Sequence, residues 1–383
     1  MMKRVLITTT VPETLATILK DQPRYLASHF QVVLATSPGA QVKQVVHNEG
    51  VELHHVPMTR GISLVDDFFS LVCMIRVLRK LKPALVHSYT PKAGLVTMVA
   101  AWLCRVPVRV HTFTGLIFPT EHGFRQKLLI WVDRLICACA TKIVPEGLGV
   151  KRDLEGFRIT KKPMCVIGHG NIAGVDTAYF SSAVRGIDQA CVELRVSLGL
   201  GPEDFLFCFV GRLNKDKGLA ELLAAFKMLP ATAHLALIGS IDQTAPVDAV
   251  TLATIESHPN VHALGFMSDI RSALGAAEVL VLPSYREGFP NVLLEAGAMA
   301  LPVIATDING CNEVIETGYN GWLVPPRNAK ALENAMRNAL QMPTNLRNEM
   351  GQHARARIVQ RFERQQHWDR MVTFYQGLLA VSK

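Results

Sequence analysis

Short apolar runs alternate with longer segments of helical period along most of this chain. In the first half these runs are rich in Val and Ile, and they predict strands at residues 3–9, 30–36, 51–58, 84–89, 106–113, 141–146 and 164–170. Residues 64–82, between two of the runs, have the period of a helix. Apolar strands that alternate with helices form a parallel sheet covered on both faces, so the class is α/β.

The alternation stops in a polar stretch, which is a predicted linker at about residues 173–200, and then starts again. The second set of predicted strands covers residues 205–213, 234–240, 261–266, 278–284 and 302–307. From about residue 328 to the C-terminus the pattern is helical. We therefore predict two Rossmann-like, doubly wound domains that face each other across a cleft, at residues 1–175 and 176–360. A helix at residues 361–383 crosses back onto the first domain.

The composition is that of a globular chain, with 49% hydrophobic and 19% charged residues. The apolar window from Ala93 to Cys104 ends after 12 residues, whereas a membrane-spanning helix needs about 20. The N-terminus enters a strand-like run without a signal-peptide pattern. The eight cysteines are scattered and match no zinc or redox spacing. These features predict a cytoplasmic protein in which cysteines serve as small buried hydrophobes.

The charge is unevenly distributed between the two halves. Residues 1–175 contain 22 Lys and Arg against 11 Asp and Glu, whereas residues 176–383 contain 18 against 21. A basic half predicts an anionic partner such as phosphate, a membrane surface or nucleic acid. No RNA- or DNA-binding motif accompanies the charge, so nucleic acid is not a predicted partner.

The first segment with candidate chemistry is GRLNKDKG, Gly211 to Gly218, directly after a predicted strand. Ligands of doubly wound sheets bind beyond the carboxyl ends of the strands. An arginine fork at Arg212 and a lysine point charge at Lys217 together suit a diphosphate. The alternative is a solvated basic turn that begins a helix.

The second segment is REGFPNVLLEAGAMALPVIAT, Arg286 to Thr306, which contains two carboxylates eight positions apart. Pro290 suits the first position of a helix, and the free N–H groups of that helix start can bind an anion. Glu295, one turn inside an apolar helix, requires a partner. Two ribose hydroxyls would satisfy it. Because Glu287 lies in a predicted loop and Glu295 further along, inside the helix that follows, they do not resemble the facing carboxylates of a glycosidase.

Four residues near predicted strand ends in the first half are candidates for a second binding region. They are Thr10, His87, Lys92 and His111. His111 is expected to end a strand and to face the cleft, and His87 stands at the equivalent end of the preceding strand. Hydrogen-bonded structural histidines are the alternative. The chain has no GxGxxG, GxxxxGK[ST] or Asp-x-Asp motif, so neither a dinucleotide cofactor nor a metal is predicted.

Taken together, GRLNKDKG, LGFMSDIRSAL and PSYREGFPNVLLEAGAMALPVIATDINGCNEVI resemble the retaining family 4 glycosyltransferases of the GT-B fold, whose signature is Glu-x7-Glu. The resemblance implies that Arg212 and Lys217 bind the donor diphosphate and that Glu295 binds the ribose. It further implies that Glu287 and the backbone of Gly288, Phe289 and Asn291 hold the donor sugar and phosphate. His111 would lie beside the sugar, and front-face displacement would proceed with retention.

Within this family the TPKAG, HTFTG and CNE segments are most similar to bacterial enzymes that extend polyprenyl-diphosphate-linked sugars for surface glycans. The partners so implied are a UDP-hexose or UDP-N-acetylhexosamine donor and a lipid-linked acceptor. The chain departs from many members because it lacks a Gly-Gly pair after the first strand. A nucleotide-sugar epimerase and a non-catalytic nucleotide-sugar-binding module are the alternatives.

An anionic membrane surface is the third partner that the sequence predicts. Residues 123–142 can present Leu128, Trp131 and Leu135 beside basic residues, a mixture that is typical of interfacial helices. The alternative is that this apolar stripe belongs to the domain core. The first interpretation predicts a peripheral protein on the inner face of the cytoplasmic membrane.

Overall fold

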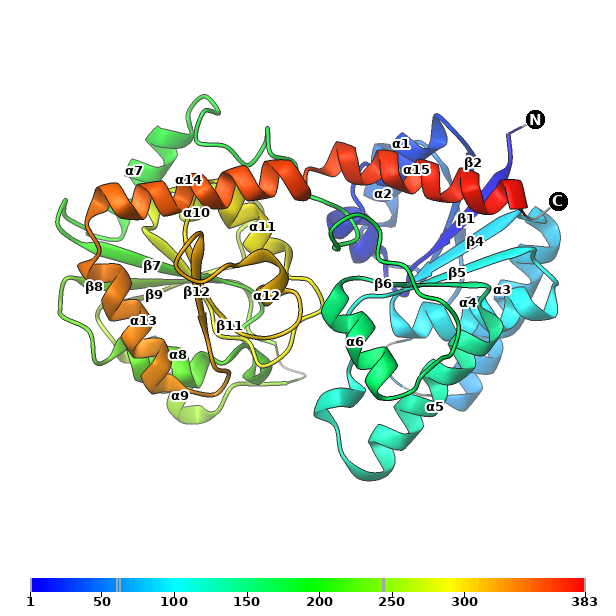
Figure 1. The fold of residues 1–383 in the computed structure, drawn as a ribbon, viewed down its shortest axis with the longest axis horizontal. Coiled ribbons are helices and arrows are strands. Elements are labelled where there is room, and N and C mark those ends of the chain that lie inside the picture. The colour runs from blue at the N-terminus through cyan, green and yellow to red at the C-terminus, as the bar shows by residue number, and fades with distance from the viewer. Residues whose placement is uncertain (1, 60, 62, 243–244, 382–383) are drawn as a thin grey trace. The chain divides into compact units, whose positions relative to one another are not determined.

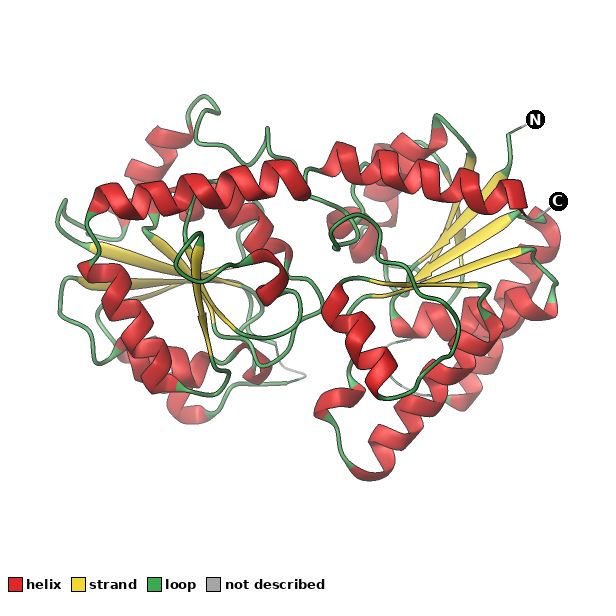
Figure 2. Cartoon of the chain, viewed as in Figure 1, coloured by secondary structure: helices red, strands yellow, loops and turns green. Residues whose placement is uncertain are grey.

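The computed structural model describes residues 2–59, 61, 63–242 and 245–381, which form two compact units. Unit 1 contains residues 1–174 and 365–383, and unit 2 contains residues 175–364. Each unit has one six-stranded parallel sheet with helices on both faces (Figures 1 and 2). The predicted α/β class with two Rossmann-like, doubly wound domains is confirmed. No helix among the described residues is long and apolar enough to span a membrane.

The sheet of unit 1 has the strand order β3-β2-β1-β4-β5-β6. Its strands are β1 Arg4–Thr8, β2 Gln31–Thr36, β3 Glu52–His55, β4 Leu85–Tyr89, β5 Val108–Phe113 and β6 Lys142–Pro145. Its helices are α1 Gln22–Ala27, α2 Val42–Glu49, α3 Leu64–Leu81, α4 Pro91–Leu103, α5 Gly123–Cys139, α6 Leu148–Gly156 and α15 Arg364–Val381, with a π-helix at Thr14–Ile18 and a 3₁₀ turn at Phe118–Thr120. The central strands β1 and β4 are buried on both faces, as their largely apolar runs predicted, although β4 also contains the buried polar residues His87 and Ser88.

The sheet of unit 2 has the order β12-β11-β10-β7-β8-β9, the same winding as in unit 1. Its strands are β7 Phe205–Val210, β8 Ala233–Ile238, β9 Val261–Gly265, β10 Val279–Leu282, β11 Val303–Thr306 and β12 Gly321–Val324. Its helices are α7 Ile187–Ser197, α8 Leu219–Phe226, α9 Ala249–Ser257, α10 Arg271–Ala276, α11 Asn291–Ala298, α12 Cys311–Val314, α13 Ala329–Gln341 and α14 Thr344–Arg361, with the 3₁₀ turn η3 at Lys215–Lys217.

Local sequence signals explain why the elements of unit 1 begin where they do. The Ser63 hydroxyl caps α3 by accepting a hydrogen bond from the Asp66 amide, and two aspartates in the first turn complement the helix dipole. The C-terminal helix α15 packs within unit 1, where Met371 and Tyr375 join the core that contains Val5 and Ile7 of β1. The helices α3, α4 and α5 cover the opposite face and share a separate core.

One predicted strand is absent from the described residues, and one strand that the structure forms was not predicted. Residues 164–170 form no strand; a single bridge joins Met164 to Ile143, and the chain then turns through Gly168 and Gly170, both with positive φ. Conversely, Gly321–Val324 forms the edge strand β12, which the pattern did not predict because the run is only four residues long and its central residues are partly exposed.

In both sheets the strand order reverses at one point, between β1 and β4 in unit 1 and between β7 and β10 in unit 2. Loops that leave the carboxyl ends of strands on either side of such a reversal splay apart and form a ligand crevice. Each unit therefore has one preferred place for a ligand site.

Candidate active site

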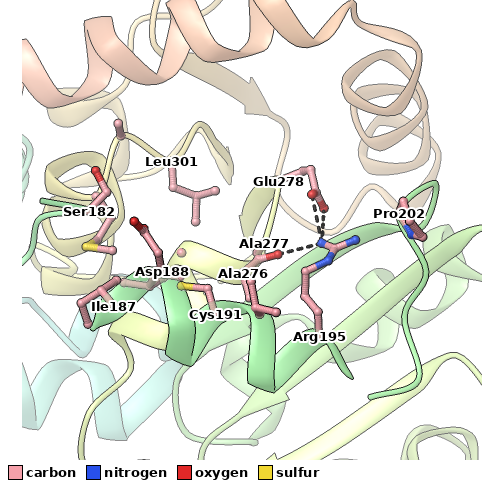
Figure 3. Close-up of a pocket in the computed structure, with 15 residues that line it drawn as sticks. Ser182, Ile187, Asp188, Cys191, Arg195, Pro202, Ala276, Ala277, Glu278 and Leu301 are labelled. Carbon is pink, nitrogen blue, oxygen red and sulfur yellow. Dashed lines mark hydrogen bonds and ion pairs between the residues drawn. The ribbon is translucent and has the colours of Figure 1, made fainter. Parts of the chain in front are cut away.

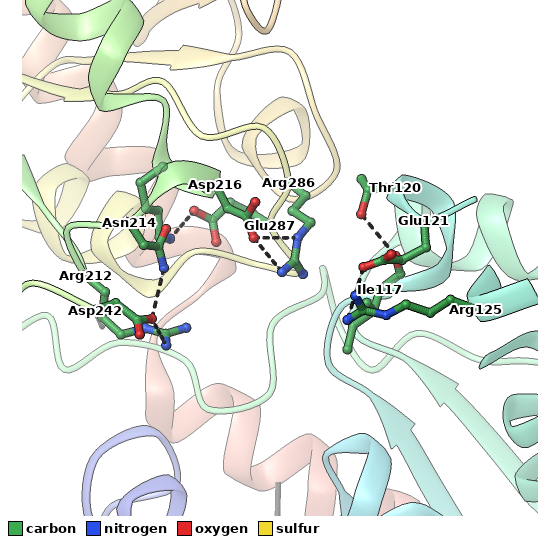
Figure 4. Close-up of polar contacts among 11 residues, drawn as sticks. Ile117, Thr120, Glu121, Arg125, Arg212, Asn214, Asp216, Asp242, Arg286 and Glu287 are labelled. Carbon is green, nitrogen blue, oxygen red and sulfur yellow. Dashed lines mark hydrogen bonds and ion pairs between the residues drawn. The ribbon is translucent and has the colours of Figure 1, made fainter. Parts of the chain in front are cut away.

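The candidate site of unit 2 is built from loops at the reversal point of its sheet. Residues 211–218 follow β7, residues 283–290 follow β10, and residues 239–242 follow β8, the neighbour of β7. The loops after β7 and β10 are joined by their backbones, because the Tyr285 amide donates a 2.8 Å hydrogen bond to the Asp216 carbonyl. The Arg286 guanidinium adds an ion pair of 2.7 Å to the Asp216 carboxylate (Figure 4).

Lys217 and Glu287 form an ion pair that bridges these two loops. Lys217 Nζ lies 2.5 Å from Glu287 Oε1, and the side chains are only 19% and 13% exposed. Lys217 ends the turn η3, after which Gly218 at φ 65° starts α8. A partly buried ammonium with three N–H donors can hold one carboxylate and still donate to an anion beside it.

Arg212 lies on the other side of the same loop and is also paired with an acid. Its Nη1 is 2.7 Å from Asp242 Oδ2, and the Asn214 amide donates to the same oxygen at 3.2 Å (Figure 4). The Arg212 side chain is 65% exposed. A guanidinium has five N–H donors and Asp242 engages one nitrogen, so Arg212 retains donors for an anion.

The segment after Glu287 can offer a ligand its backbone amides rather than its side chains. The Phe289 ring is buried and packs against Phe362, with the ring centroids 5.5 Å apart. Helix α11 begins at Asn291, and Pro290 is its N-cap residue rather than its first helical residue. The first amides of α11 carry the positive end of the helix dipole. Gly288, Phe289 and Asn291 can therefore meet a ligand through their main chain.

Glu295 lies in the second turn of α11 between buried apolar residues. Its carboxylate makes no hydrogen bond or ion pair with any residue that the structure describes. Burial raises the pKa of Glu295 from its usual 4.5 to about 7. A carboxylate in these surroundings is satisfied only by a donor from outside the chain. Among the charged candidate residues of unit 2, Glu295 is the one whose side chain has no hydrogen-bond or ion-pair partner among the described residues.

The two candidate histidines of unit 1, His87 and His111, lie inside strands, and the expectation that they end strands was wrong. β5 continues through Thr112 and Phe113, so His111 is interior and 1% exposed, and its Nδ1 is 2.8 Å from the Ser88 hydroxyl. Burial lowers the pKa of His111 to about 3, so the ring is neutral near pH 7. The His111 ring packs directly on Gly94, where an added Cβ would lie 2.3 Å from Cε1.

His87 belongs to a closed hydrogen-bond network of unit 1. Its Nδ1 is 2.6 Å from the Tyr375 hydroxyl, and its Nε2 is 2.6 Å from the Thr112 hydroxyl. Burial lowers the pKa of His87 well below its usual value. Both ring nitrogens of His87 are thus occupied by side chains of the same unit.

Thr10 and Lys92 lie at the reversal point of the sheet of unit 1, where the loop after β1 meets the start of α4. The hydroxyls of Thr10 and Thr90 are 2.7 Å apart, and Thr10 Oγ1 accepts from the Ala93 amide at 3.2 Å. The Lys92 ammonium forms an ion pair with Asp67 of α3. The structure therefore brings Thr10 and Lys92 to one helix start.

Known protein families match both halves of the chain. The family described as "Glycosyl transferases group 1" matches residues 193–357, and "Glycosyl transferase 4-like domain" matches residues 16–170. The capsular polysaccharide biosynthesis glycosyltransferase CapM of Staphylococcus aureus is 30% identical over 371 residues, which cover 96% of this chain and 95% of CapM. The chain belongs to the family 4 glycosyltransferases of the GT-B fold.

Two further proteins are similar to this glycosyltransferase. The UDP-Gal:α-D-GlcNAc-diphosphoundecaprenol α-1,3-galactosyltransferase of Escherichia coli is 27% identical, with 86% of this chain and 84% of that protein covered. The crystal structure of HepE from Anabaena in complex with UDP superposes with a TM-score of 0.82 at 18% identity, covering 98% of this chain and all of HepE. The second similarity concerns the fold alone.

A hollow of about 540 Å³ lies elsewhere in unit 2 of this glycosyltransferase (Figure 3). Its walls include Ala276 to Glu278 and Met299 to Leu301, which precede β10 and β11. It therefore lies at the amino ends of these strands, whereas the ligands of doubly wound sheets bind at the carboxyl ends. Arg195 in its wall is already paired with Glu278 at 3.0 Å.

Sequence reasoning missed several residues that shape the candidate sites of this glycosyltransferase. They are the acids that hold the predicted cations, Asp242 and Asp67, and the glycines that let backbones touch, Gly218 and Gly310. A Cβ at Gly218 would lie 2.1 Å from the Pro283 carbonyl oxygen, and one at Gly310 would lie 2.4 Å from the Gly288 carbonyl oxygen. The position of each glycine at the end of a motif loop is the sequence signal that could have identified Gly218 and Gly310.

Proposed function

We propose that this glycosyltransferase moves a hexose or N-acetylhexosamine from a UDP-sugar to an undecaprenyl-diphosphate-linked saccharide, with retention of anomeric configuration. The names of the relatives support a place in capsular or other surface-glycan biosynthesis, and the E. coli relative acts on a diphosphoundecaprenol-linked acceptor. Unit 2 is proposed to bind the donor and unit 1 the acceptor. The reaction is that of a hexosyltransferase of the EC 2.4.1 class.

One observation carries the proposal. Two cations, Arg212 and Lys217, lie on the same strand-end loop as donors for a diphosphate, and Glu295 is an unpaired carboxylate in the second turn of the neighbouring helix α11. Phosphates and ribose of a nucleotide sugar match these two chemistries. In this arrangement the carboxylate of Glu295 accepts two ribose hydroxyls, while the start of α11 faces phosphate.

The residues of unit 2 have the following proposed roles. Arg212 and Lys217 stabilise the negative charge that develops on the departing UDP, which is the main catalytic contribution when a leaving group is a phosphate. Glu287 and the backbone of Gly288, Phe289 and Asn291 hold the donor sugar and its phosphate. The donor phosphate itself accepts the proton of the acceptor hydroxyl, so no protein base is required.

The residues of unit 1 have proposed roles at the acceptor. Thr10 and Lys92 supply a hydroxyl and a cation at the start of α4, where an acceptor diphosphate would be stabilised. His111 is proposed to lie beside the transferred sugar as a neutral ring. A direct role for His87 would require it to give up Tyr375 or Thr112, so we propose that it acts by orienting this strand pair.

The proposal is tested by incubating the purified protein with UDP-sugars and a polyprenyl-diphosphate saccharide. UDP release that depends on the acceptor is expected, and NMR of the new linkage should show the anomeric configuration of the donor. An inverted product would refute retention. Conversion of UDP-N-acetylglucosamine without any acceptor would indicate an epimerase instead. If no UDP-sugar released UDP in the presence of the acceptor, the proposed donor and acceptor would be refuted.

Glu295→Gln is expected to remove a pH dependence of donor binding. Only the ionised carboxylate accepts two hydroxyl hydrogens, and its pKa is about 7. The KM of the unaltered protein for the UDP-sugar should therefore rise about tenfold from pH 8 to pH 6. The variant should have a high KM at pH 8 that changes little with pH. Glu349→Gln, at an exposed glutamate of α14, is the matched control.

The raised pKa of Glu295 also makes the free energy of unfolding depend on pH. The pKa of Glu295 is higher in the folded protein than the 4.5 of an ordinary glutamate, so the folded state retains the proton longer as the pH rises. Stability is thus lost between about pH 4.5 and pH 7 through this group. Melting temperatures measured across that window should decline less for Glu295→Gln than for the unaltered protein. Parallel declines would mean that Glu295 titrates normally.

A further inference from the structure

The helices α3, α4 and α5 form one layer on a single face of the sheet of unit 1 (Figure 1). The crossovers from β3 to β4, β4 to β5 and β5 to β6 all advance in one direction across the sheet, and right-handed crossovers therefore place their helices on the same face. α3 packs against α4, α4 packs against α5, and their inner sides share one core. The outer side of this layer is unusual in composition.

Aromatic side chains are concentrated on that outer side. Of the six Phe and Trp residues that are exposed in the described chain, five belong to this layer: Phe68, Phe69, Trp102, Phe124 and Trp131. The sixth is Phe266 of unit 2. Single exposed hydrophobic residues are ordinary, but such a concentration marks an interaction surface.

On α5 the exposed residues follow a strict helical spacing. Phe124, Lys127, Trp131, Arg134 and Ala138 are all exposed and recur at intervals of three and four residues, so they form one stripe along the helix. Phe124 is 81% and Trp131 is 61% exposed. Leu128 and Leu135, which the sequence suggested for this stripe, are only partly exposed. Aromatic and basic side chains thus alternate on a single face of α5.

On α3 the same spacing yields a stripe that is apolar first and basic afterwards. Val65, Phe68 and Phe69 are 81%, 68% and 56% exposed, and Arg76 and Arg79 continue the line towards the C-terminal end. α4 lies between the two stripes and is buried along most of its length; its exposed end carries Trp102 and Leu103.

The exposed charges of the layer are almost all positive. Among the described residues 63–139, eight basic side chains are exposed: Arg76, Arg79, Lys80, Lys82, Arg105, Arg125, Lys127 and Arg134. Asp66 is the one exposed carboxylate in the same part of the chain. Exposed aromatics with surrounding Lys and Arg fit the interface of an anionic bilayer, where rings enter the headgroup region and cations meet lipid phosphates.

We propose that the outer face of the α3, α4 and α5 layer docks on an anionic lipid bilayer through Phe68, Phe69, Phe124 and Trp131. This inference rests on the proposed function, because a lipid-linked acceptor must be reached at a membrane. The surface is continuous with the acceptor candidates. Phe68 directly follows Asp67, whose carboxylate holds the Lys92 ammonium at the start of α4. A docked layer would therefore hold Lys92 close to lipid-attached phosphate.

Flotation of the full-length protein with vesicles tests the proposal. Vesicles of phosphatidylcholine with 30 mole per cent phosphatidylglycerol are expected to bind the protein, and vesicles of phosphatidylcholine alone are expected to bind it weakly. Phe124→Ser with Trp131→Ser should lower the partition coefficient about tenfold, and Phe68→Ser with Phe69→Ser should act similarly. Lys127→Glu with Arg134→Glu should lower the partition coefficient by a similar factor at low salt. The difference from the unaltered protein should shrink at high salt, because salt screens the attraction between the basic side chains and the lipid phosphates.

Two matched variants control for these changes. Phe266→Ser removes the exposed aromatic of unit 2, and Lys20→Glu with Lys43→Glu reverses exposed charges that precede α1 and lie on α2 of unit 1. Neither should alter flotation. Equal binding by the stripe variants and the unaltered protein would overturn the proposal, as would absence of binding to anionic vesicles. Light scattering that shows a dimer disrupted by the stripe changes would also overturn it and would assign the face to a second copy.

Failure of this proposal can be distinguished from failure of the proposed function. UDP release is measured in the same variants with a short-chain, water-soluble diphosphate saccharide as the acceptor. The stripe variants should retain it within about twofold, because none of the altered residues belongs to the candidate active site. Loss of flotation with intact UDP release supports the docking face. Flotation without UDP release from any donor would leave the docking face standing and would refute the proposed reaction.

Discussion

Lys217→Ala is expected to lower kcat/KM by about 10²–10³, the largest loss for a single side chain in the donor site. The lysine is the least exposed cation of the loop after β7, and its ammonium is fixed by Glu287 at 2.5 Å. A charge that is held in place before the reaction stabilises a departing diphosphate without reorganisation, which is why its removal should affect kcat more than KM. Acceptor-dependent UDP release, followed over a range of donor concentrations, measures both constants.

Two variants separate this role from simple destabilisation. Lys215→Ala removes an exposed lysine of the same η3 turn and should change kcat/KM less than about threefold. Lys217→Ala alone leaves the 13%-exposed Glu287 without its cation, which lowers stability by about 1–3 kcal/mol. Lys217→Ala with Glu287→Ala removes that penalty and should melt at a higher temperature than the single variant. Recovery of activity in the double variant would contradict the role proposed for Lys217.

The parts of the fold that the sequence predicted are those in which burial alone determines the pattern. β10 is enclosed on both faces and is apolar at every position, and β1 departs from this pattern only at its ends, Arg4 and Thr8, so both runs clearly predict strands. β12 was not predicted, because an edge strand of four residues that is buried mainly at its ends has no clear apolar run. The false strand at residues 164–170 shows the converse, since a short apolar run with glycines can also be a turning segment beside β6.

The candidate site was predictable where residue type and position after a strand specify the chemistry. Lys217 and Glu287 belong to loops on neighbouring strands, and strand order brings their side chains together. The acid partner of Arg212 was not predictable, because Asp242 lies 30 residues away in a loop without a motif. The candidate histidines His87 and His111 were misplaced for a different reason. A polar residue near the end of an apolar run is typical of a strand end, yet His87 can be buried inside a strand because the hydroxyls of Tyr375 and Thr112 satisfy its ring nitrogens.

The principal cations of both candidate sites, Arg212, Lys217 and Lys92, are each held by one carboxylate that the protein supplies. Such a partner lowers the conformational freedom of a long basic side chain and fixes the direction of its remaining donors. The carboxylate also reduces the net positive charge of the site, so each site discriminates between anionic ligands by their geometry as well as by their charge. The acids are therefore as much a part of the two sites as the cations.

Gly218→Ala is expected to cause the largest structural loss at the donor site. Gly218 has φ 65°, and a Cβ there would lie 2.1 Å from the Pro283 carbonyl oxygen. Because the obstructing atom is backbone, the loops after β7 and β10 must separate, and this separation removes the contact between Lys217 and Glu287. We expect a loss of about 3 kcal/mol or more in the free energy of unfolding. Donor binding, measured by calorimetry with UDP, should weaken by at least about tenfold.

Gly199→Ala is the matched control for the conformational part of this loss. Gly199 is also in unit 2 and also left-handed, at φ 71°, but a Cβ there would have no neighbour within 4 Å. The left-handed conformation alone costs a non-glycine residue about 1–2 kcal/mol, and UDP affinity should be unchanged in this variant. The difference in melting temperature between the two variants then reports the collision with Pro283. Equal destabilisation by both changes, with UDP affinity intact in Gly218→Ala, would show that the two loops tolerate separation and that their close approach does not shape the donor site.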